Sequence, residues 1–129
     1  TSKTYYLTGY IIIVIHSLIT HGIGLAILTP PWMEYVLDDE RVDKFVEYGV
    51  NVWGIDANKD KYEIARESID KTREFFLSLG IPMTLREVGI GEENLENMAK
   101  AAIEHKGGEV GNFKPLCYED VLAIYKKAL

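Results

Sequence analysis

The chain has little cysteine and little positive charge, and each shortage excludes a class of function. Its single cysteine, Cys117, can form no disulfide within the chain and has no cysteine or histidine neighbour at the spacing of a metal site. We therefore expect an inert thiol and a reducing, cytoplasmic location. The 14 basic residues are outnumbered by 20 acidic ones and are scattered, which predicts that nucleic acid is not a partner.

A phosphate-binding glycine loop is also missing. Neither Gly22-Ile23-Gly24 nor Gly107-Gly108 qualifies, because neither follows a credible strand in a βαβ unit. The chain shows no internal repeat, and 47% of its 129 residues are hydrophobic, which suits one domain with one core. Because it begins with Thr1 rather than Met, we expect that it was processed, trimmed or taken from inside a longer reading frame.

Charged residues are absent from Thr4 to Met33, a stretch of 30 residues. A bilayer span needs only about 20 apolar residues, so this length raises the possibility of a membrane helix. Two histidines, two prolines and three glycines interrupt the stretch, and Lys3 is its only flanking cation. These features disfavour a membrane span, and a secretory signal fits less well because its charged start and small-residue cleavage site are not both present.

Apolar residues recur at helical spacing along most of the chain after Asp38. Four stretches show this pattern, and they cover Val42–Trp53, Tyr62–Leu79, Leu95–Ile103 and Val121–Leu129. No stretch after Asp38 has a strand pattern strong enough to build a sheet. The predicted fold class is therefore all-α.

The ends of these helices carry start and stop signals. Asp38 or Asp39 can cap the first helix, and Asn58 or Asp60 the second, which Gly80 ends. Glu92 and Glu93 lie at the positive end of the third helix, which His105, Lys106 and Gly107 close. In the last helix Cys117 takes the N-cap position, with Asp120 at the third helical position.

The first third of the chain is ambiguous. The β-branched run Ile11–Ile15 favours a strand, whereas its neighbours favour a helix, and the sequence leaves both open. From His21 to Leu37 the pattern predicts a buried helix that is interrupted or kinked at Pro30-Pro31.

Three histidines are candidate metal ligands. His105 lies at a polar helix end, where an imidazole complements the helix dipole and needs no other role. His16 and His21 would lie roughly 140° apart around a helix, at about 100° per residue, so they cannot converge on one metal ion. A lone histidine in an apolar stretch is more often a hydrogen-bonded core residue than a ligand.

The string from Thr20 to Met33, Thr-His-Gly-Ile-Gly-Leu-Ala-Ile-Leu-Thr-Pro-Pro-Trp-Met, resembles a segment of iron-type (group III) alcohol dehydrogenases of the butanol dehydrogenase branch. In that segment a histidine followed by glycine binds the catalytic metal. Further matches are Val50–Gly54, the Thr72–Phe76 centre of the second helix, Gly80-Ile81-Pro82 with Leu85, and Pro115-Leu116 with Asp120-Val121. The likeness covers residues 20–129, whereas residues 1–19 look like an unrelated segment.

The resemblance implies the helical C-terminal domain of a two-domain enzyme, without the nucleotide-binding domain. In this family a divalent metal, iron or zinc, is held by an Asp and three His between the domains. The metal acts as a Lewis acid on the substrate oxygen while NAD(P) exchanges a hydride with an alcohol or aldehyde. Of the four ligands only His21 carries over. The position of another ligand holds Leu7, and the position of a further family histidine holds Ile11. The Asp and the first His of the set would precede the chain.

Three readings follow. The first is a metal- and substrate-side domain that binds neither metal nor NAD(P) tightly and is inactive unless a nucleotide-binding partner chain completes it. The second is a small helical interaction module that forms a homo-oligomer, because the apolar first third would expose a patch in a monomer. The third is a helical domain anchored in a membrane by the uncharged segment.

Overall fold

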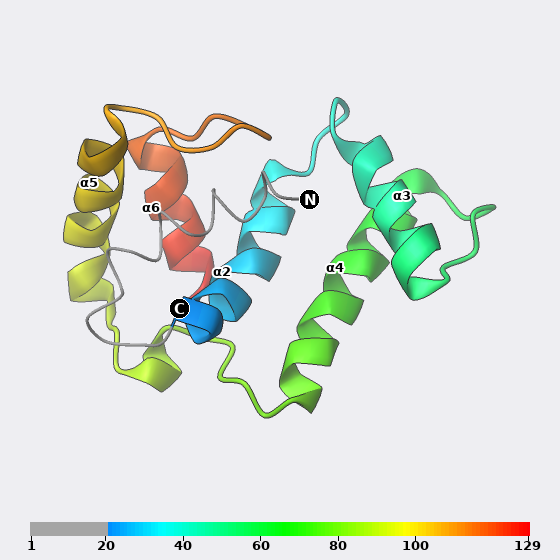
Figure 1. Cartoon of the computed structure of the whole chain (residues 1–129), viewed down its shortest axis with the longest axis horizontal. Helices are drawn as coiled ribbons and strands as arrows, with labels where there is room; N and C mark the ends of the chain where they lie inside the picture. Colours follow the sequence, from blue (N-terminus) through cyan, green and yellow to red (C-terminus); the bar gives the residue numbers. More distant parts are fainter. Residues whose placement is uncertain (1–20) are drawn as a thin grey trace.

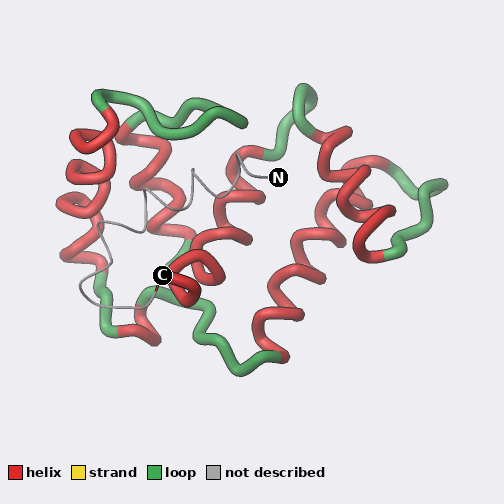
Figure 2. Tube along the Cα trace, in the orientation of Figure 1, coloured by secondary structure: helices red, strands yellow, loops and turns green. Residues whose placement is uncertain are grey.

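The computed structural model describes residues 21–129, which form five α-helices and two short 3-10 helices (Figure 1). These elements are α2 (His21–Val36), α3 (Val42–Trp53), α4 (Lys61–Ser78), η1 (Arg86–Val88), η2 (Glu92–Asn94), α5 (Leu95–Lys106) and α6 (Tyr118–Lys127). Within this described part no strand forms, and the only extended pairing is an isolated antiparallel bridge between Val110 and Leu116 (Figure 2). The predicted all-α class is confirmed.

Helix α2 lies in the middle of the domain (Figure 1). It packs against α4 on one side and α6 on the other, while α3 packs on the outer side of α4 and α5 on α6. A helix in this position needs apolar residues on several faces, and the sequence of α2 supplies them. Its fully buried side chains include Ile27, Leu28 and Val36. They form one core cluster with residues of all the other α-helices.

The two prolines do not interrupt α2, which runs continuously from His21 to Val36. Proline has no N–H, so the carbonyls of Ala26 and Ile27 lack the amide partner that an ordinary helix would give them. The sequence predicted an interruption or a kink at these prolines, and the interruption is wrong because the helix continues past them. Tertiary packing explains the difference, because Pro30 and Pro31 are both buried and the apolar residues around them hold the helix together.

The predicted caps of α4 and α6 are confirmed. The Asp60 carboxylate accepts hydrogen bonds from the backbone N–H groups of Tyr62 and Glu63, at 3.1 and 3.3 Å. Cys117 is the N-cap of α6, and its backbone N–H donates to the Asp120 carboxylate at 2.9 Å. This reciprocal capping box fixes where α6 begins.

The predicted cap of α3 is wrong. Arg41 takes the N-cap position and makes no side-chain capping bond. Asp38 instead accepts the backbone N–H of Arg41 at 3.0 Å, in the turn before the helix. At the other end, Gly54 closes α3 with a φ of 67°, a left-handed conformation that glycine adopts readily.

The buried residues of α4 and α6 agree in part with the apolar residues whose helical spacing predicts an inward face. Ala65, Ile69 and Thr72 of α4 are buried, but Leu79, the last residue of the α4 pattern, is 59% exposed. In α6 Val121 and Tyr125 are fully buried as expected. Ile124, also fully buried, was not predicted to face inward. None of the described helices is long and apolar enough to cross a membrane.

Helices α3 and α4 approach each other closely at Gly49. A Cβ atom at this position would lie 2.9 Å from Cγ2 of Ile64 and 3.2 Å from Cδ1 of Ile55. Both neighbours are buried, so neither can move away freely. Glycine at position 49 therefore sets the spacing between the two helices.

We predict that Gly49→Ala lowers the free energy of unfolding by about 1–3 kcal/mol, because the added methyl group overpacks this contact. Gly22→Ala in α2 is the matched control. A Cβ atom there meets no atom of residues 21–129 within 4 Å, so the helix-favouring alanine is expected to be neutral or to stabilise by up to about 1 kcal/mol. Urea denaturation measures both variants, and equal effects at the two positions would contradict the prediction.

Candidate functional site

His21, the predicted metal ligand, is the first residue of α2. The described structure fixes this backbone position, and the ligand role stays a prediction. His16, Leu7, Ile11 and the rest of the segment 1–19 lie outside the described residues. His105 lies where it was predicted, in the last turn of α5 and on the surface.

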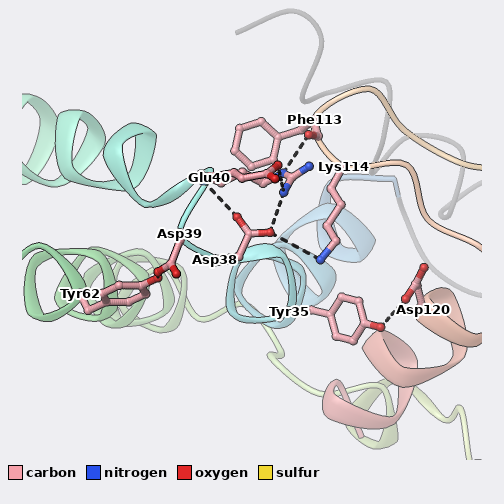
Figure 3. A network of polar contacts seen from close by, with 9 residues as sticks. Tyr35, Asp38, Asp39, Glu40, Tyr62, Phe113, Lys114 and Asp120 are labelled. Atoms are coloured by element: carbon pink, nitrogen blue, oxygen red, sulfur yellow. Dashed lines mark hydrogen bonds and ion pairs between the residues drawn. The ribbon is translucent and has the colours of Figure 1, made fainter.

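The position of α2 depends on the contacts that hold its C-terminal end. Glu34, near the C-terminal end of α2, pairs with Arg73 of α4 at 2.6 Å and with Lys127 of α6 at 3.9 Å. The next residue, Tyr35, donates its hydroxyl hydrogen to the Asp120 carboxylate of α6 (Figure 3). These contacts tie α2 to both of its neighbours.

A second polar network fixes the turn between α2 and α3 (Figure 3). The Arg41 guanidinium pairs with Asp38 at 2.6 Å and donates through Nε to the carbonyl of Phe113 at 3.0 Å. Lys114 approaches the other side of Asp38 at 3.7 Å. Phe113 also packs its ring against Trp32, with 5.7 Å between ring centroids. These contacts hold the loop before α6 against the C-terminal end of α2.

These contacts lower the pKa values of the carboxyl groups of Asp38 and Asp120. Partial burial would raise the pKa of Asp38, but the charge and hydrogen bonds of Arg41 outweigh it and lower the pKa. At Asp120 burial also raises the pKa, and the hydrogen bonds from Tyr35 and Cys117 outweigh it. The hydrogen bond between Tyr35 and Asp120 raises the pKa of the Tyr35 hydroxyl to about 12. Both carboxylates are therefore charged near neutral pH.

The thiol of Cys117 is exposed and has a raised pKa. Its backbone hydrogen bond with Asp120 lowers the pKa, but hydrogen bonds from the thiol to the carboxylates of Asp120 and Glu119 outweigh that effect. A raised pKa keeps the less reactive protonated form at neutral pH. This agrees with the expectation of an inert thiol.

The described residues do not form a metal centre by themselves. In this part of the chain, no group of three or more His, Cys, Asp or Glu residues is placed to hold a metal ion. Catalytic zinc and iron sites use at least three protein ligands. The described residues alone therefore do not complete a metal site, and we derive no reaction step through a metal.

Comparison with known proteins identifies the family to which this helical domain belongs. Residues 14–129 match the model of the C-terminal part of the Fe-containing alcohol dehydrogenase family. The chain belongs to this family. The match begins at Val14, ahead of the predicted boundary at Thr20, and the separate origin of residues 1–19 stays a prediction.

Individual relatives agree with this assignment. The chain is 64% identical over 110 residues to NADH-dependent butanol dehydrogenase A of Clostridium acetobutylicum, covering 85% of this chain and 28% of the relative. Identity to butanol dehydrogenase B of the same organism is 56% over 112 residues, covering 86% of this chain and 29% of the relative. The butanol dehydrogenase branch inferred from residues 20–129 is confirmed.

Solved structures show the same fold. The butanol dehydrogenase A of Thermotoga maritima matches with a TM-score of 0.81 and 27% identity, over 95% of this chain and 32% of that one. The cofactor-free aldehyde reductase YqhD of E. coli matches with a TM-score of 0.81 and 26% identity, over 96% and 32%. The chain thus spans about a third of the length of the proteins it matches.

Sequence reasoning missed the residues that anchor α2. Tyr35 and Asp120 are 85 positions apart, Glu34 and Arg73 are 39 apart, and Arg41 and Phe113 are 72 apart. No local pattern pairs residues at such separations. The only available signal was that Glu34 and Tyr35 are polar groups at the end of a long apolar helix.

We predict that Tyr35→Phe lowers the free energy of unfolding by about 1 kcal/mol at neutral pH, because Asp120 loses a hydrogen bond to its charged form. The folded-state pKa of Asp120 is lowered, so this stabilisation is present above the unfolded pKa of about 4. It is lost as pH falls through the lowered pKa. The difference between wild type and variant should therefore shrink in acid.

Denaturation of the wild type and of Tyr35→Phe, from neutral pH down to below about pH 4, measures this difference in the free energy of unfolding. Tyr118→Phe is the matched control, because Tyr118 is also half-buried and its hydroxyl makes no hydrogen bond with the described residues. An equal loss in the two variants, or a difference that grows in acid, would show that the Tyr35–Asp120 bond does not stabilise α2.

Proposed function

We propose that the chain is the metal- and substrate-side helical domain of an NAD(P)-dependent alcohol dehydrogenase that interconverts alcohols and aldehydes. The observation that carries this proposal is the 64% identity to NADH-dependent butanol dehydrogenase A, which extends over 85% of the chain. That likeness covers far more than a short motif. It supports a small alcohol or aldehyde as substrate, and the single cysteine supports a cytoplasmic location.

His21 is, in this proposal, one ligand of a divalent metal ion, iron or zinc. It opens the helix that lies at the centre of the domain, so a rigid element positions its backbone. Because the described residues provide no cluster of three donors, the remaining ligands come from elsewhere. We propose that they and the NAD(P) site belong to protein outside residues 21–129 or to a nucleotide-binding partner chain.

The purified 129-residue protein is accordingly expected to be inactive. With NADH or NADPH, butanal and added Fe²⁺ or Zn²⁺, the absorbance of the reduced cofactor should stay constant. Calorimetry should detect no metal binding with a Kd below about 1 µM, which corresponds to a binding free energy of about 8 kcal/mol. Complete structural zinc sites reach about 10–16 kcal/mol. Steady turnover by the pure protein would refute the expectation of inactivity.

A chimera tests the proposed role of His21 in an assembled enzyme. In the chimera, residues 20–129 replace the matching segment of the Clostridium acetobutylicum butanol dehydrogenase A. The two segments are similar enough for this replacement to pack against the rest of that enzyme. We expect this chimera to bind metal and to reduce butanal with NADH. In the chimera His21→Ala should lose bound metal and lower kcat/KM by at least about 100-fold, because a metal site that loses a ligand loses both affinity and Lewis acidity.

His105→Ala in the same chimera is the control, because His105 is an exposed histidine at the far end of another helix. It should keep the metal content and the rate. Elemental analysis and steady-state kinetics measure both quantities, and circular dichroism verifies the fold of each variant. A folded His21→Ala chimera that keeps its metal and its activity would exclude His21 as a ligand.

A second candidate function is self-association, and a specific surface favours it. The exposed large apolar side chains of the described residues, Val52, Phe75, Leu77 and Leu79, all lie at the C-terminal ends of α3 and α4. We call them the end patch. They are 48–60% exposed, and Phe75 also touches the ring of Trp53, at 6.1 Å between centroids. Large apolar side chains exposed in this number are a feature of interaction sites when they gather on one face.

If the end patch joins two copies, the protein should form dimers at high concentration, and Leu77→Ser with Leu79→Ser should shift them to monomers. Both leucines are more than half exposed, so the double variant should still fold. Light scattering after size exclusion measures the mass. Glu96→Ser with Lys100→Ser, on the exposed side of α5, is the control and should leave the mass unchanged. A wild-type protein that stays monomeric would contradict this function.

A further inference from the structure

We draw no further inference here: the strongest candidate, the open groove of about 570 Å³ at the turn between α2 and α3, lined by Asp38, Asp39, Glu40, Arg41, Lys114 and Pro115, is an acidic cluster in which Asp38 already pairs with Arg41 and Lys114, and no second observation in the described residues points to a ligand.

Discussion

The described structure depends on the burial of α2. This helix separates two outer pairs, α3 with α4 and α5 with α6, and it is the element that contacts both pairs. Each fully buried leucine or isoleucine contributes about 1.5–3 kcal/mol. Ile27, Leu28 and Val36 together therefore supply several kcal/mol, comparable to the whole stability of a small domain. Without α2 the two pairs would have no shared core.

This burial explains how the helix accommodates two adjacent prolines. An isolated helix would lose about 3 kcal/mol at each interior proline, and it would end there. In α2 both rings are buried among apolar neighbours, and the Thr29 hydroxyl donates to the carbonyl of Leu25 at 2.6 Å. Packing outweighs local propensity, because α2 makes contacts on several faces. Polar contacts from Glu34 and Tyr35 then fix its rotation against α4 and α6.

The sequence predicted those features that depend on neighbouring residues. The Asp60 and Cys117 caps, the closing Gly107 and the all-α class follow from patterns within a few positions. Periodicity could not show that Leu79 is 59% exposed, because the burial of a helix end depends on how neighbouring helices cross. It also could not pair Arg41 with Phe113, or place Asp38 in a turn rather than at a cap.

The candidate site, like the fold, combines features that the sequence predicts with features that it does not. Family likeness selected His21, and the structure adds that this residue belongs to α2, the central helix, whose C-terminal end contacts both neighbouring helices. A metal centre, however, needs several donors that converge from different elements, and the described residues bring no such group together. Fold and family are carried by a core that one segment can complete alone. In the function proposed above, catalysis depends in addition on groups outside the described residues, because no cluster of three metal donors lies among them.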